Sequence, residues 1–159
     1  MRSQDAARRR DRQTGRALSA IGSALYGLAI GAVRRSPREL SLTSAATLAT
    51  LDRTGPRRIT DLAVIEGVTQ PAMTVLVQVM EESGLVERRG DPSDKRVTLM
   101  SLTEAGASYV RARRRTGVHA FVRLIDELTD DEVEALMAAL PALQHLAELD
   151  SQGREGPKQ

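Results

Sequence analysis

The sequence predicts a mainly α-helical fold with one small β-hairpin. Apolar residues recur at spacings of three and four along most of the chain, as they do on one face of an amphipathic helix. This period changes only between Leu85 and Leu102, where two short β-prone runs flank a turn-rich charged loop. A chain of 159 residues has room for one compact domain with appended helices.

Three helices are expected in the first part of the chain, over residues 13–34, 41–53 and 60–66, after an arginine-rich segment 1–12 that we expect to be disordered. The first helix carries an aliphatic stripe at helical spacing: Leu18, Ile21, Leu25, Leu28 and Ala32. The residue before a proline avoids the helical conformation. The first two helices should therefore end before Pro37 and Pro56. Thr60 is the expected N-cap of the third helix, and Gly67 is its expected terminator.

The fourth helix is expected to begin after Thr69, a favourable N-cap, and to end before Gly84. Its apolar residues share one face and should be buried: Met73, Leu76, Val77 and Met80. The opposite face should then be exposed, with its polar and small residues: Gln70, Pro71, Ala72, Thr74, Val75 and Gln78. A hairpin formed by residues 85–89 and 97–102 should follow, with a turn over 90–96.

Two further helices complete the predicted fold. Thr103 is expected to cap the fifth helix, and Thr129 and Glu132 have the spacing of a capping box that opens the sixth. The sixth helix has its own apolar stripe: Val133, Leu136, Met137, Leu140, Leu143 and Leu146. Pro141 falls inside this stripe and should kink the helix or end its first half. Residues 151–159 are expected to form a disordered tail.

Charge is distributed unevenly, although the net charge is only +2. Residues 1–16 hold six arginines and two acidic residues, whereas residues 117–150 hold eight acidic residues and Arg123 as the single basic one. This asymmetry favours a polyanionic partner on one side of the protein, although a solvated charged surface is an equal alternative. Aromatic residues make up 2% of the chain and tryptophan is absent, so single-stranded nucleic acid would find no stacking platform. Double-stranded DNA is the better candidate.

Several kinds of chemistry have no support in the sequence. The absence of cysteine excludes disulfides, thiolate metal sites and thiol-based sensing. The two histidines, His119 and His145, lie far apart without a metal-ligand pattern, and no catalytic triad spacing or glycine-rich phosphate loop is present. We therefore expect no enzyme activity, catalytic residue, metal or cofactor. No long uninterrupted apolar run and no export signal are present, so the predicted location is the cytoplasm without membrane attachment.

The order of helix, tight turn, helix and hairpin is the most informative feature. Two helices joined by a short glycine-containing turn form a helix-turn-helix, whose second helix can enter the DNA major groove. Within the exposed face given above, Gln70 and Gln78 can hydrogen-bond adenine, and the small apolar residues can pack on thymine methyl groups. Thr69 and Thr74 suit phosphate oxygens. The alternative is that the glutamines are only solvated and the threonines only cap the helix.

Three segments in and beside the hairpin are distinctive: Gly84-Leu85-Val86-Glu87-Arg88, Asp91-Pro92-Ser93-Asp94-Lys95-Arg96 and Leu102-Thr103-Glu104-Ala105-Gly106. Through them, residues 59–106 resemble the core of the multiple antibiotic resistance regulator (MarR) family. The hairpin of this family, called the wing, usually reads Asp-Pro-Arg-Asp-Arg-Arg and runs into a strand and Leu-Thr-x-x-Gly. Ser93 stands here for the usual arginine, and Val75 occupies a position that is often basic. Both departures lower the expected electrostatic attraction to DNA.

The resemblance implies a winged helix-turn-helix lobe over residues 41–116 and a helical dimerisation lobe from residues 13–35 and 117–150. It implies a homodimeric transcriptional regulator, expected to repress from a pseudo-palindromic operator and to be released by a small, often aromatic effector whose binding residues are not assigned. In the wing, Lys95 and Arg96 would reach phosphate and the minor groove, and Asp91 and Asp94 would brace the loop by pairing with these cations. A protein-interaction module and a constitutive DNA-binding protein are the alternatives.

Overall fold

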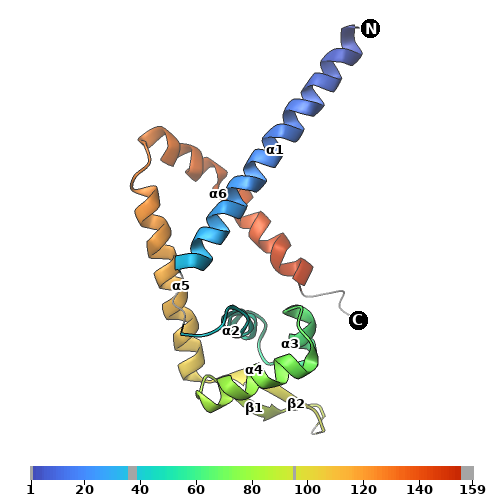
Figure 1. Cartoon of the computed structure of the whole chain (residues 1–159), viewed down its shortest axis with the longest axis vertical. Coiled ribbons are helices and arrows are strands. Elements are labelled where there is room, and N and C mark those ends of the chain that lie inside the picture. The colour runs from blue at the N-terminus through green and yellow to red at the C-terminus, as the bar shows by residue number, and fades with distance from the viewer. Residues whose placement is uncertain (1, 36–38, 95, 155–159) are drawn as a thin grey trace. The chain divides into compact units, whose positions relative to one another are not determined.

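The computed structural model describes residues 2–35, 39–94 and 96–154 (Figure 1). Its described elements are six helices and two strands: α1 (Arg2–Arg35), α2 (Leu42–Thr54), α3 (Ile59–Ile65), α4 (Gln70–Glu82), β1 (Val86–Gly90), β2 (Thr98–Leu102), α5 (Glu104–Ile125) and α6 (Asp130–Arg154). The chain divides into two units, Met1–Pro37 with α1 and Arg38–Gln159 with the other elements. The predicted mainly α-helical class with one hairpin is confirmed.

The two ends of the chain are more helical than expected. Helix α1 begins at Arg2, so residues 2–12 of the segment expected to be disordered are helical. No glycine or proline interrupts the chain before Gly15, and arginine, glutamine and alanine are favourable helix formers. At the other end α6 continues through Pro141 to Arg154, so the proline does not end the helix. Residues 155–159 of the expected tail lie outside the described residues.

The hydrophobic core of the second unit is built by α2, α3, α4 and the hairpin. Its buried members are Leu48, Leu51, Leu62, Ala63, Met73, Val77, Met80, Val86 and Met100. Met73, Val77 and Met80 are fully buried, and Leu76 packs partly buried against them, as the spacing predicted. Burying this face of α4 leaves its opposite face exposed.

The starts of α2 and α3 have different capping arrangements. Ser41 caps α2 by accepting a hydrogen bond from the Ser44 backbone N–H at 3.0 Å. Helix α3 instead begins at Ile59 after Arg58, whose side chain makes no capping hydrogen bond. The predicted capping role of Thr60 is therefore wrong.

A backbone bridge sets the first residue at which α3 can begin. The Arg57 N–H donates to the Met100 carbonyl at 3.0 Å, and the Met100 N–H donates to the Arg57 carbonyl at 2.7 Å. This bridge places Arg57 beside β2 and keeps the backbone extended through Arg58. The helix can therefore begin only at the following residue.

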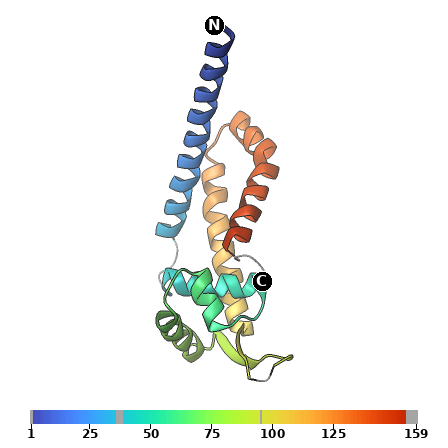
Figure 2. The same cartoon turned by 90° about the vertical axis from the view of Figure 1, so that its right-hand side faces the viewer.

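The hairpin pairs its strands in antiparallel register, with Val86 opposite Leu102 and Gly90 opposite Thr98. Figure 2 shows the tip of the hairpin extending outward from the helices of the second unit. Val86 and Met100 fill the core from one face of this small sheet, while most side chains of the tip are exposed. The tip is therefore available to a partner.

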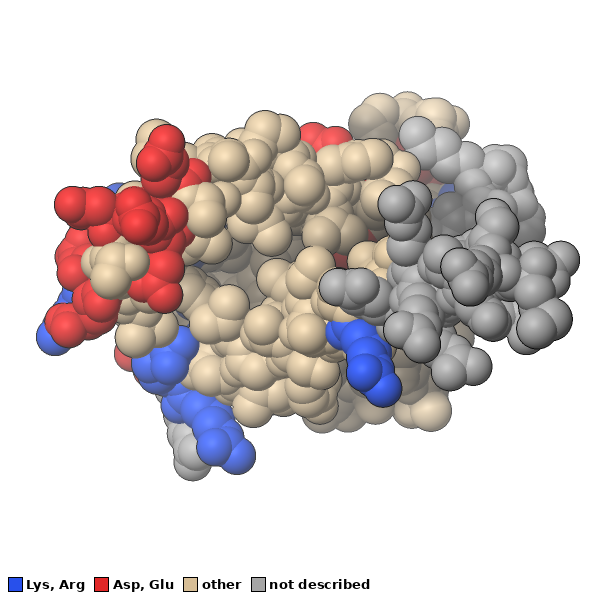
Figure 3. All heavy atoms as spheres, turned by 90° about the horizontal axis from the view of Figure 1, so that it is seen from above, with Lys and Arg blue, Asp and Glu red and all other residues tan. Residues whose placement is uncertain are grey.

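The C-terminal helices begin as predicted. Thr129 and Glu132 form the capping box: the Thr129 N–H donates to Glu132 Oε2 at 2.9 Å, and the Glu132 N–H donates to Thr129 Oγ1 at 3.4 Å. The Thr129 hydrogen bonds also lower the pKa of the Glu132 carboxyl. Acidic side chains gather over the turn between α5 and α6 (Figure 3). These residues are Asp126, Glu127, Asp130, Asp131, Glu132 and Glu134.

Candidate DNA-binding surface

Helices α3 and α4 have the geometry of a helix-turn-helix. Their axes are bent by 110° at the connection, within the usual range for this motif. Gly67 in the connection has φ +63°, a left-handed conformation that glycine adopts without steric cost. The Thr50 hydroxyl of α2 donates to Glu66 Oε1 at 2.7 Å and ties α2 to the end of α3. This bond holds the turn that leads into α4 against α2.

The exposed face of α4 contains every recognition residue predicted from the sequence. Thr69 and the six predicted residues of the helix are all exposed: Gln70, Pro71, Ala72, Thr74, Val75 and Gln78. Pro71, Val75 and Gln78 form one row directly opposite the buried face, at spacings of four and three residues. Glu82 continues this row by one helical turn and is also exposed. The sequence reasoning missed Glu82, although its position four residues after Gln78 was a usable signal.

Three polar side chains on this face already have partners. The Thr69 hydroxyl caps α4 by accepting from the Ala72 N–H at 3.4 Å, and the Thr74 hydroxyl donates to the Gln70 carbonyl at 2.9 Å. Gln78 Nε2 donates to Glu82 Oε1 at 3.0 Å. A phosphate contact from Thr74 would therefore require its hydroxyl to leave the Gln70 carbonyl.

Two aspartates brace the wing turn, and their described partners are a serine and backbone N–H groups. Asp91 Oδ1 accepts from the Ser93 N–H at 2.8 Å and from the Ser93 hydroxyl at 2.6 Å. Asp94 Oδ1 accepts from the backbone N–H of Arg96 at 2.9 Å. Among the described contacts Asp94 thus reaches the backbone of Arg96, and not the side chain that the resemblance implied. Lys95 lies outside the described residues.

Ser93, which replaces the usual arginine of the family, has a structural role in this turn. Its hydroxyl and then its backbone N–H hold the pKa of the Asp91 carboxyl below its usual value, and the Arg58 charge adds to the effect. Asp91 is therefore ionised at neutral pH and accepts both hydrogen bonds. The Arg96 side chain is exposed, and none of the described carboxylates forms an ion pair with it.

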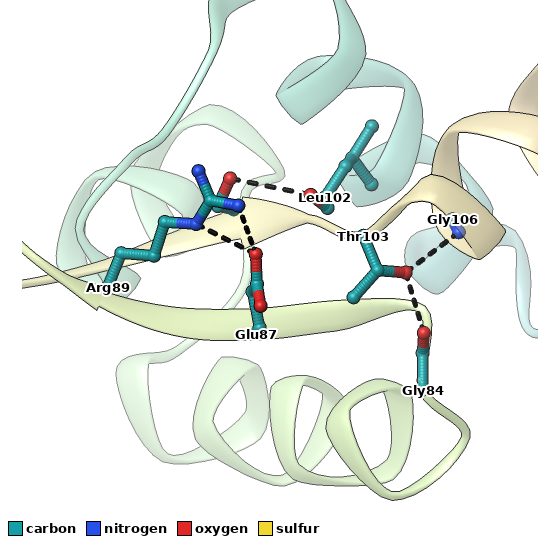
Figure 4. A network of polar contacts seen from close by, with 7 residues as sticks. Gly84, Glu87, Arg89, Leu102, Thr103 and Gly106 are labelled. Atoms are coloured by element: carbon teal, nitrogen blue, oxygen red, sulfur yellow. Dashed lines mark hydrogen bonds and ion pairs between the residues drawn. The ribbon is translucent and has the colours of Figure 1, made fainter.

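The other arginines beside this surface are mostly engaged. Arg88 Nε lies 3.1 Å from Glu81 Oε2, and Arg89 Nε donates to Glu87 Oε1 at 2.7 Å (Figure 4). These glutamates offset part of the attraction that the two arginines could offer to phosphate. Helix α4 itself contains no lysine or arginine. The positive charge beside this surface thus lies in the wing and at Arg57 and Arg58 before α3, and not on α4.

The base of the wing is joined to α4 and α5 by Thr103 (Figure 4). Its hydroxyl donates to the Gly84 carbonyl at 2.6 Å and accepts from the Gly106 N–H at 3.0 Å, which confirms the predicted cap of α5. Its backbone N–H donates to the Leu85 carbonyl at 3.1 Å. A Cβ atom added to Gly106 would lie 2.0 Å from that same carbonyl oxygen. The threonine and glycine of the Leu-Thr-x-x-Gly segment therefore form one junction.

The comparisons with known proteins identify the family. The MarR family profile matches residues 40–98, which include α3, α4 and most of the wing. Over 113 residues the chain is 31% identical to an uncharacterized HTH-type transcriptional regulator, ML2140, of Mycobacterium leprae, covering 70% of this chain and 79% of that relative. The chain belongs to the MarR family. This MarR-family protein is therefore a DNA-binding transcriptional regulator and not an enzyme.

Solved structures confirm the winged helix fold. The transcriptional regulator Tm0710 from Thermotoga maritima superposes with a TM-score of 0.67 at 20% identity, covering 89% of this chain and 98% of that one. A variant of MepR from S. aureus bound to an oligodeoxyribonucleotide superposes with a TM-score of 0.58 at 22% identity, covering 83% and 94%. At sequence identities of 20% and 22%, these two superpositions show a similarity of fold.

Proposed function

We propose that this MarR-family regulator is a cytoplasmic homodimer that represses transcription by occupying a pseudo-palindromic operator. The observation that carries the proposal is the exposed face of α4 together with the exposed Arg96 side chain of the wing. A helix in the major groove and a cation beside it make two contacts with one duplex. Occupying an operator that overlaps a promoter excludes polymerase without any further contact, so repression is the mode we propose.

The proposed contacts divide into base reading and backbone contact. Gln70 and Gln78 read adenine, while Pro71, Ala72 and Val75 pack against thymine methyl groups. The N-terminus of α4, with Thr69, faces a phosphate, because the unpaired N–H groups of a helix start attract anions. In the wing, Lys95 and Arg96 contact the backbone or minor groove, and Asp94 holds the turn that presents them.

The apolar stripes of α1 and α6 support the proposed homodimer. Leu18 is 63% exposed, Ile21 is 55% exposed, and Leu140 in α6 is 50% exposed. Contiguous apolar stripes of this size are unusual on a monomer, and a two-fold partner can cover them. Residues Thr14–Arg35 also have the length and composition of a membrane span. We favour a protein partner because polar Ser19 and Ser23 lie away from the aliphatic stripe, whereas a spanning helix is apolar all round.

For release from DNA we propose a small aromatic effector, the class that the family resemblance implies. The chain has no cysteine, so thiol oxidation cannot be the trigger. Among the described residues, no group of three or more histidine or acidic side chains could hold a metal ion. In one form of the dimer the spacing of the two α4 helices fits the operator, and in another it does not. An effector that binds the second form more tightly by a few kcal/mol would empty the operator.

Selection from a random duplex library tests the proposed function directly. We expect the purified protein to enrich an inverted repeat whose half-sites lie about 10 bp apart, because a two-fold dimer presents two α4 helices one DNA turn apart. Binding should weaken steeply with salt as phosphate contacts release counterions. Fragments without an inverted repeat, or affinity indifferent to salt, would contradict the proposal.

Two substitutions separate the roles within the surface. Arg96→Ala should weaken binding to every duplex and lower the salt slope by about 1, because a wing cation contributes mainly electrostatic attraction. Gln70→Ala should cost about 1–3 kcal/mol on the selected operator and little on random DNA. Arg114→Ala, which removes an exposed arginine of α5, is the control and should change neither quantity. Equal losses on operator and random DNA for both test variants would mean that the surface is misassigned.

A further inference from the structure

Gln78 and Glu82 form a side-chain pair on the outward row of α4. The Gln78 amide nitrogen lies 3.0 Å from Glu82 Oε1. A carboxylate only accepts hydrogen bonds. Gln78 must therefore turn its NH2 group, and not its own Oε1, towards Glu82. The pair therefore fixes which way the amide is turned, and it leaves Gln78 Oε1 and one amide hydrogen available to a ligand.

Glu82 lies where its negative charge would weaken DNA binding, so its presence calls for a role such as holding the Gln78 amide. Its row lies opposite Met73 and Val77 and thus faces the proposed duplex, whose phosphates repel a carboxylate. The neighbouring Glu81 is paired with Arg88 at 3.1 Å, whereas no described lysine or arginine pairs with Glu82. Helix α4 has no basic residue of its own to offset this charge. The observed partner of Glu82 is the Gln78 amide.

We propose that Glu82 is a positioning residue that makes Gln78 selective for adenine over guanine. This inference rests on the proposed entry of α4 into the major groove. Adenine presents an N6 amine and the N7 acceptor there, which match the free Gln78 oxygen and the remaining amide hydrogen. Guanine presents two acceptors, O6 and N7, and would require the amide to turn its NH2 group towards the base. That turn would bring the Gln78 oxygen against the Glu82 carboxylate, so Glu82 disfavours guanine.

The test measures binding by fluorescence anisotropy on the selected operator and on duplexes with A·T replaced by G·C at each half-site position. Wild type should prefer adenine at one position of each half-site by about tenfold or more. Gln78→Ala should lose this preference. Glu82→Ala should lose most of it, yet bind random duplex more tightly because a repulsive charge is removed. Duplexes with 7-deazaadenine, which lacks the N7 acceptor, or purine, which lacks the amine, should weaken wild type at that position only.

Glu82→Gln distinguishes positioning from charge. Its amide oxygen can still accept the Gln78 hydrogen bond, so the adenine preference should survive while affinity for random duplex rises. Glu81→Ala is the matched control on the same helix and should leave the preference unchanged. The proposal would be overturned if Glu82→Ala kept the adenine preference. It would also be overturned if Glu82→Gln lost the preference as fully as Glu82→Ala, because the carboxylate itself would then read the base. If wild type binds no selected duplex at all, the proposed function fails instead.

Discussion

Replacing Gly106 with alanine is expected to lower the free energy of unfolding by about 3 kcal/mol or more. The new Cβ atom would lie 2.0 Å from the Leu85 carbonyl oxygen, a distance that the backbone can relieve only by moving. Moving α5 away would also weaken the 3.1 Å hydrogen bond from the Thr103 N–H to the same oxygen. Urea unfolding followed by circular dichroism measures the change.

Gly117→Ala is the matched control on the same helix. Gly117 lies in the interior of α5, and a Cβ atom built there meets no atom within 4 Å. Alanine is the better helix former, so this variant should be more stable than wild type by up to about 1 kcal/mol. If both variants gained stability, the close approach at Gly106 would have no energetic importance.

Leu140→Glu is expected to weaken the proposed dimer by about 3–5 kcal/mol, the cost typical of leaving an unpaired charge buried. Leu140 is 50% exposed and belongs to the apolar stripe of α6, so the substitution should leave the fold of one subunit intact. A two-fold interface would contain the new charge twice. Sedimentation equilibrium across a range of concentrations measures the shift from dimer to monomer.

The control for this experiment places the same charge on the other side of α6. Ala138 is exposed and lies away from the stripe of Leu136, Leu140 and Leu143. Ala138→Glu should therefore dimerise like wild type. A Leu140→Glu protein that remains a dimer at wild-type concentrations would place the interface elsewhere.

Features governed by local sequence were predictable. The two faces of α4 follow from the spacing of Met73, Val77 and Met80, and the caps at Thr69, Thr103 and Thr129 follow from local hydrogen bonding. The wing motif, from Asp91 to Arg96, is itself specific enough to indicate the family. These signals need no knowledge of distant contacts.

Features governed by tertiary contacts were not predictable in the same way. The start of α3 depends on the bridge between Arg57 and Met100, which are far apart in the sequence. The bracing of the wing depends on whether an aspartate reaches a backbone N–H or a cationic side chain, and residue types alone allow both. The link between Gly84 and Gly106 through Thr103 likewise exists only in the folded chain.

The junction at Thr103 has a mechanical consequence. One threonine connects Gly84 and Leu85, between α4 and β1, to the first turn of α5 through three hydrogen bonds. Reorienting α4 or the wing relative to the start of α5 would therefore break a hydrogen bond at this point. We expect a signal that tilts α5 to move the two proposed DNA contacts together.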